Sequence, residues 1–186
     1  MPLFGKKKVL GAQIGAEFFK RIQDGHQAEF PDDRELFPGD AQISRRLVFD
    51  EWLYFKIFLV DYSTFLALGR TPEKFKVLDP FWRSVQAWLN EYQVAALPER
   101  LSVFDGGPKA IPVENAEFAF SRLLRRMKGY SAAVQTTHQL GENYSVASVF
   151  LNSCGSFNAL TAVGISTLFS SEKIGYVKLL KSIRIV

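Results

Sequence analysis

The chain has 186 residues and a formal net charge of +4, and 47% of its residues are hydrophobic, including 17 phenylalanines. This length fits a single domain with a sizeable core, and this hydrophobic content excludes a wholly disordered chain. The lone cysteine, Cys154, excludes an internal disulfide and a cysteine-based zinc site, and it favours a reducing compartment.

The first predicted element is a helix over about residues 8–23. Its apolar residues recur at helical spacing: Leu10, Ile14, Phe18 and Ile22. Gly11 and Gly15 are four residues apart, so another backbone can approach this helix closely. The lysines at 6–8 precede too short an apolar run for a signal peptide, and we expect a cytoplasmic protein.

The segment 42–69 predicts one long helix with many aromatic residues. Its apolar residues form a wide face and, on the other side, a second stripe: Phe49, Leu53, Val60 and Ala67. Asp40 is a candidate N-cap, and Gly69 stands where a left-handed residue would end the helix. We expect this helix to contact protein on two sides and to form the centre of the fold.

Two helix-start signals follow the central helix. Thr71 with Pro72, and then Asp79 with Pro80, each resemble an N-cap followed by the first helical residue. They predict a short helix and a second one that runs to about residue 96. Residues 97–112 contain three prolines and two glycines, so this segment is predicted to be a loop or an internal hinge.

Another long helix is predicted over 112–140, with Gly141 as its stop. Its buried side is expected to hold four apolar residues: Phe120, Leu123, Leu124 and Met127. The three arginines Arg122, Arg125 and Arg126 are then expected to face outward, and they mark a candidate ligand or partner surface.

The segment 145–170 is almost free of charge and predicts a single helix. One side is expected to carry large apolar groups such as Leu160, and another to carry small residues. Its length could span a bilayer, but its many asparagine, serine and threonine residues favour a buried helix packed on the 42–69 helix. The tail, 172–186, predicts a basic amphipathic helix that docks on the domain or contacts a partner's groove or an anionic membrane surface.

Candidate catalytic and metal sites are scarce. The two histidines, His26 and His138, lie in no metal-binding motif. No histidine follows Cys154 in the sequence to activate its thiol, so a catalytic cysteine is not predicted. No catalytic residue, metal or cofactor is therefore predicted. The tryptophans Trp52, Trp82 and Trp88 could line an aromatic pocket for a small molecule.

These patterns predict a single all-α domain over residues 1–186, a bundle of six or seven helices around the 42–69 and 145–170 helices. The leading functional hypothesis is a non-enzymatic interaction module that self-associates as a homodimer or binds a partner protein. The alternatives are a peripheral membrane protein held by its basic termini and a small-molecule binder with an aromatic pocket. The modest net charge does not predict nucleic-acid binding.

Overall fold

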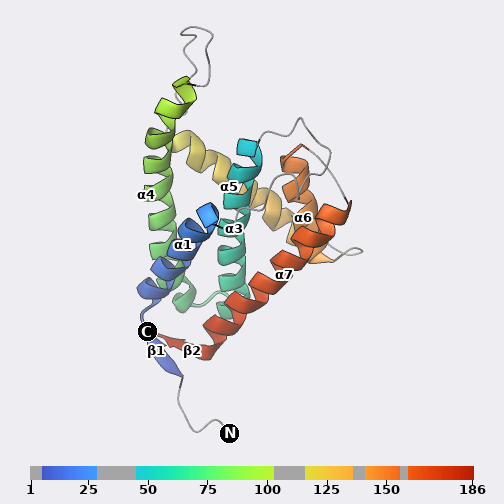
Figure 1. The fold of residues 1–186 in the computed structure, drawn as a ribbon. Helices are drawn as coiled ribbons and strands as arrows, with labels where there is room; N and C mark the ends of the chain where they lie inside the picture. The colour runs from blue at the N-terminus through green and yellow to red at the C-terminus, as the bar shows by residue number, and fades with distance from the viewer. Residues whose placement is uncertain (1–5, 29–44, 103–115, 136–140, 156–158) are drawn as a thin grey trace.

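The computed structural model describes residues 6–28, 45–102, 116–135, 141–155 and 159–186, and over these residues the protein is an all-α bundle (Figure 1). The elements in chain order are β1 (Lys7–Val9), α1 (Gly11–Ala28), α3 (Arg45–Leu68), α4 (Pro72–Ser102), α5 (Ala116–Gln135), α6 (Glu142–Ser153), α7 (Ala159–Ser182) and β2 (Ile183–Ile185). The six described helices pack against one another. The predicted fold class is confirmed.

Helix α3 is the centre of this bundle, and both of its predicted apolar sides are buried along most of the helix, although Phe65 and Leu66 near its end are each 41% exposed. Phe55 on one side and Val60 on the other have no exposed surface. The Phe55 ring lies 5.6 Å from that of Phe150 on α6 and 5.8 Å from that of Phe169 on α7. Gly69 ends the helix as predicted, with φ +62°, whereas Asp40 and residues 42–44 lie outside the described residues.

Helices α1 and α4 meet backbone to backbone, as the glycine spacing predicted. A Cβ at Gly15 would lie 2.3 Å from the carbonyl oxygen of Val77, and a Cβ at Gly11 would lie 2.6 Å from the Cβ of Lys76. Only glycine allows two helices to come this close.

The prediction of two helices between residues 71 and 96 is wrong, because α4 runs through Pro80 without a break. A proline inside a helix costs about 3 kcal/mol. Val77 and Phe81, on either side of it, have no exposed surface, and their burial offsets that cost. The segment 97–102 belongs to α4, so the predicted loop is wrong over these residues. Residues 103–115 lie outside the described residues, so the rest of the predicted loop or hinge stays a prediction.

The prediction of one helix over 145–170 is also wrong. Helix α6 ends at Ser153 with Cys154 as its C-cap, and Gly155 takes a φ of +83° that turns the chain away from the helix axis. Helix α7 then continues through the predicted boundary near residue 171, because Phe169 and Leu180 are buried along the same helix. The expected packing of this region on the central helix is confirmed, since α7 packs on α3.

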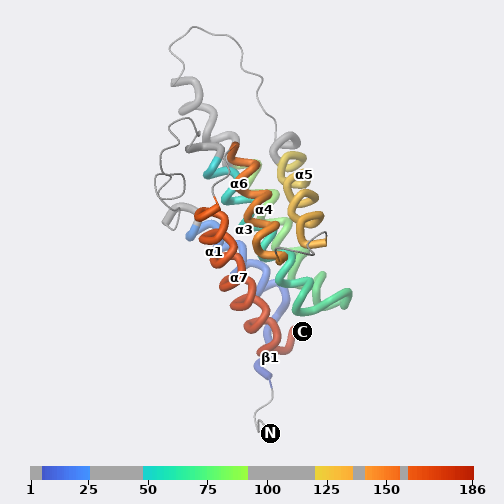
Figure 2. Tube along the Cα trace, turned by 90° about the vertical axis from the view of Figure 1, so that its right-hand side faces the viewer, coloured from blue at the N-terminus to red at the C-terminus, as the bar shows by residue number. Residues whose placement is uncertain are grey.

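Both ends of the described chain form strands where helix was predicted. Strands β1 and β2 pair in parallel, with Lys8 opposite Arg184 and Val9 opposite Ile185. β-branched residues favour this extended conformation, and Val9 and Ile185 pack on the edge of the core. The pairing brings the start and the end of the chain to one end of the bundle (Figure 2).

Candidate functional site

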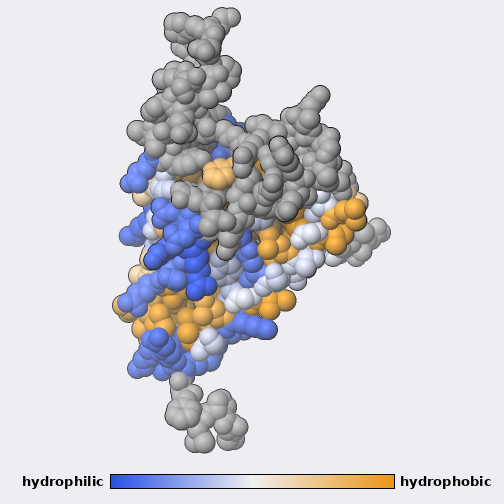
Figure 3. All heavy atoms as spheres, viewed as in Figure 1, coloured by the Kyte–Doolittle hydropathy of each residue, from blue (hydrophilic) through white to orange (hydrophobic). Residues whose placement is uncertain are grey.

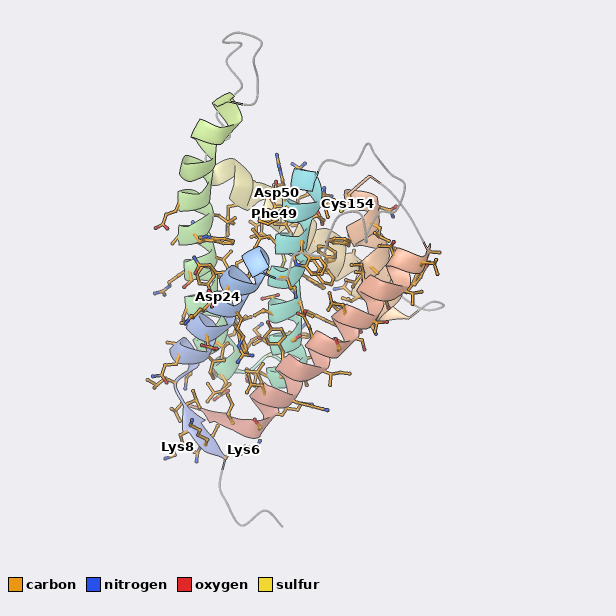
Figure 4. The ribbon with its side chains drawn as sticks, viewed as in Figure 1. Lys6, Lys8, Asp24, Phe49, Asp50 and Cys154 are labelled. Atoms are coloured by element: carbon orange, nitrogen blue, oxygen red, sulfur yellow. The ribbon has the colours of Figure 1, made fainter. Side chains whose placement is uncertain are left out.

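One end of the bundle gathers basic residues from three separate parts of the chain. We call this surface the basic end. It comprises Lys6, Lys7, Lys8, Arg70, Lys74, Lys76, Lys178, Lys181 and Arg184. Eight of these side chains are exposed, and Lys74 is half-buried. The strand pairing unites the first group with the last, and Lys6 and Lys8 lie at the lower end of the molecule in Figure 4.

Acidic residues offset only part of this charge, and one of them, Asp61 on α3, interacts electrostatically with Lys74. Segments 6–10, 69–79 and 174–186 carry nine basic residues and two acidic ones, Glu73 and Asp79. The Glu73 carboxyl accepts hydrogen bonds from its own backbone amide and from Thr71, which lower its pKa. The basic end therefore keeps a strong positive charge at neutral pH.

Exposed apolar side chains lie among these basic residues. Phe75 and Leu10 are each 53% exposed, and Phe65 is 41% exposed. The Lys74 ammonium lies 4.6 Å from the ring centre of Phe75 and 5.8 Å from that of Phe65, so one cation contacts both aromatic rings. Figure 3 shows hydrophobic surface across the lower part of the molecule, directly above the hydrophilic surface at its tip.

A groove of about 720 Å³ extends this apolar surface between the end of α3 and the last turns of α7. Leu66, Ile174 and Val177 supply its apolar lining, and the polar residues along it are Lys173, Lys178, Lys181 and Ser182. Lys173 donates hydrogen bonds to Glu142 and Asn143 on α6, at 2.6 and 2.8 Å. Lys178 and Lys181 form no ion pair with another described residue, so they can serve an anionic ligand.

The structure does not bring the three tryptophans together. Trp52 is in the core, stacked on Phe55. Trp88 packs edge-on against Phe19 of α1. Trp82 donates a 3.3 Å hydrogen bond from its indole nitrogen to Asp61.

A shallow hollow of about 520 Å³ lies beside Trp82, between α4 and α5. It is also lined by Leu124, which was expected to be buried but is 42% exposed. The other tryptophans do not line it. A hollow with one tryptophan gives less support to a small-molecule site than the predicted aromatic pocket would.

The prediction that all three arginines face outward is wrong for Arg126. Arg125 is exposed and Arg122 half-buried, whereas the Nε of Arg126 forms a 3.0 Å ion pair with Oε2 of Glu51, which is only 1% exposed. Tyr130 donates a 2.6 Å hydrogen bond to the other carboxylate oxygen of Glu51. These contacts join α3 and α5.

Glu51, Arg126 and Tyr130 form a group that we call the Glu51 cluster, and it extends to α6. Arg126 donates from Nη1 to the hydroxyl of Ser153, at 2.8 Å. Burial raises the pKa of Glu51, although Tyr130 and Arg126 act in the opposite direction. The adjacent thiol of Cys154 is buried, which raises its pKa to about 12 and keeps it protonated and weakly nucleophilic. The cluster is suited to holding three helices together, and Figure 4 places Cys154 far from Lys6 and Lys8.

A signal for the Glu51 cluster was present in the helical periodicity. Glu51 falls on the apolar face of α3, three residues after Val48 and four before Phe55. Arg126 similarly lies between the buried residues Leu123 and Tyr130 on its own helix. A carboxylate on one apolar face and a guanidinium beside another predict a buried ion pair, because neither charge is tolerated alone in a core.

Comparison of the chain with known protein families, with curated proteins and with solved structures finds no match. Among the described residues, no helix has both the length and the apolar character needed to cross a bilayer.

Proposed function

We propose that the protein is a non-enzymatic peripheral membrane protein whose basic end binds an anionic lipid surface. One observation carries the proposal. Parallel pairing of β1 with β2 places two basic segments, distant in sequence, beside exposed apolar residues on one end of a rigid bundle. Clustered lysines and arginines with interspersed apolar side chains are the usual means of binding anionic bilayers.

The expected affinity follows from the charge and the apolar area. Each basic residue close to an anionic membrane contributes about 1 kcal/mol, so four of the nine would contribute about 4 kcal/mol. One inserted apolar side chain adds about 2 kcal/mol. A sum of about 6 kcal/mol corresponds to reversible binding with a dissociation constant of tens of micromolar. Because anionic lipids concentrate in the cytoplasmic leaflet, the proposal keeps the predicted cytoplasmic location.

Reversing the charge of Lys7 and Lys8 together is expected to lower binding to vesicles of phosphatidylcholine and phosphatidylserine by about tenfold or more at low salt. Both side chains are exposed, and the backbone pairing of β1 does not depend on them. Cosedimentation of Lys7→Glu/Lys8→Glu with these vesicles measures the effect. Binding of the wild type should also fall with added salt.

A matched control variant is Lys20→Glu/Arg83→Glu, which changes two exposed residues outside the basic end. It should bind nearly as well as the wild type. The proposal fails if wild-type protein does not sediment with phosphatidylserine vesicles at low salt, or if both double variants lose binding equally.

Self-association, the leading hypothesis from the sequence, is a second candidate, supported by the outer face of α7. Leu160 is 83% exposed and Val163 57% exposed on this face, and a second copy of the chain could cover both. Light scattering should then give twice the chain mass of 21.0 kDa, and Leu160→Asp/Val163→Asp should restore the monomer. A strict monomer of the unmodified protein at high concentration would exclude this candidate.

A further inference from the structure

We infer that Phe65 and Phe75, with Lys74 between them, form a preformed wedge that enters the acyl-chain boundary of the bilayer, so that binding depends on lipid packing as well as on charge. This inference rests on the proposed membrane function. It identifies the residues that enter the membrane and the kind of lipid surface that they need.

Lys74 makes a cation–π contact with each of the two rings and so links them. Its ammonium lies over both of them, although Phe65 is on the last turns of α3 and Phe75 on the first turn of α4. An ammonium next to aromatic rings can reach lipid phosphates while the rings enter the apolar layer beneath, as lysine and aromatic residues do at membrane interfaces.

The wedge stands on a rigid support. The amide of Gly69 donates a 2.7 Å hydrogen bond to the carbonyl of Phe65 and closes the end of α3. The start of α4 lies directly against the start of α1, where Lys76 touches Gly11. Leu10, immediately before Gly11, adds a third apolar group beside this contact. Side chains held in place before binding lose little conformational freedom when they insert.

A bilayer explains these residues better than a water-soluble polyanion does. An acidic protein segment or a nucleic acid could neutralise the lysines but would leave Phe75 and Leu10, both 53% exposed, largely in water. The interface of a bilayer accepts both kinds of group at once.

A fluorescent label at position 75 tests insertion directly. Cys154 is 2% exposed with a pKa near 12, so an environment-sensitive thiol label should react with the new cysteine of Phe75→Cys. Addition of phosphatidylserine vesicles should shift the label's emission to the blue. The same label in Leu160→Cys, on the outer face of α7, should not shift. Equal emission changes at the two positions, or none at position 75 while the protein sediments with the vesicles, would overturn the wedge but leave the proposed function in place.

A binding series tests the dependence on packing. Phe75→Ala should weaken binding to fluid phosphatidylserine vesicles by about five- to tenfold, because a half-exposed ring has that much apolar area left to bury. Its salt dependence should match that of the wild type. Wild-type protein should bind saturated, tightly packed vesicles of the same charge less well, by a similar factor. Equal binding to both kinds of vesicle, or capture by an acidic polymer as tight as by vesicles, would refute the inference.

Discussion

Replacement of Arg126 by methionine is expected to lower the free energy of unfolding by about 3–5 kcal/mol at neutral pH. The guanidinium is the cation paired with Glu51, whose side chain is 1% exposed. Methionine keeps much of the volume but removes the charge and the donor to Ser153. The carboxylate would then be buried with only the neutral hydroxyls of Tyr130 and Ser153 as hydrogen-bond donors. Urea denaturation of Arg126→Met and the wild type measures the loss.

The loss should depend on pH in a defined direction. Burial already raises the pKa of Glu51, and Arg126 opposes that rise, so its removal raises the pKa further. The folded variant then binds the Glu51 proton more tightly than the unfolded chain does. Its free energy of unfolding therefore falls as the pH rises above the pKa of Glu51 in the unfolded chain, about 4.5. The difference from wild type should be smaller at about pH 5 than at about pH 8.

Two further variants separate the buried charge from a general loss of packing. Arg125→Met changes an exposed neighbour and should alter stability by no more than about 0.5 kcal/mol. Glu51→Gln added to Arg126→Met removes the unpaired charge. The double variant should therefore regain part of the stability and lose the pH dependence that the Glu51 proton causes. If Arg126→Met matched Arg125→Met in stability at neutral pH, the ion pair would have no structural role.

Helical periodicity was enough to predict the centre of the fold. The apolar residues of α3 recur on two sides of one helix, and both sides are buried except at Phe65 and Leu66 near its end. Gly69 marks its end because the chain there adopts a positive φ that glycine tolerates best. The close contact of α1 with α4 was also readable from Gly11 and Gly15, although the sequence did not identify α4 as the neighbour.

Local rules failed where tertiary packing decides the outcome. Pro80 is a helix-start signal in isolation, yet buried residues on both sides of it keep α4 continuous. Leu160 is a large apolar residue in a helix, yet it faces outward on α7 because α6 and α7 are separate helices with separate faces. Gly155, which divides them, lies inside the segment 145–170 that the sequence pattern predicts as one helix.

Local sequence pattern also predicted only part of the candidate site. The basic character of both termini was evident in the sequence, and a membrane contact was one of the alternatives. The meeting of these segments was not predictable from local pattern, because β1 and β2 are three residues each and pair across almost the whole chain. Phe65 falls on the wide apolar face of the predicted 42–69 helix, and nothing in the sequence pattern indicates that Lys74 contacts both Phe65 and Phe75.

Substitution of Gly15 by alanine is expected to lower the free energy of unfolding by about 2–3 kcal/mol, although alanine favours helix more than glycine does. The new methyl group would lie 2.3 Å from the carbonyl oxygen of Val77 and 3.1 Å from the backbone nitrogen of Phe81. Backbone atoms in the middle of α4 cannot move aside like a flexible side chain. The two helices must separate by roughly 1 Å, which loosens the contacts around Phe18 and Phe81. The denaturant midpoint of Gly15→Ala should therefore be lower than that of the wild type.

Gly175→Ala provides the matched comparison, because Gly175 is also inside a helix but a Cβ there would meet nothing within 4 Å. This variant should gain about 0.5–1 kcal/mol from helix propensity alone. The two glycine-to-alanine changes should thus move the midpoint in opposite directions. If Gly15→Ala were stabilising as well, α1 and α4 could not be in backbone contact, and the rigid support that the aromatic wedge requires at the basic end would be absent.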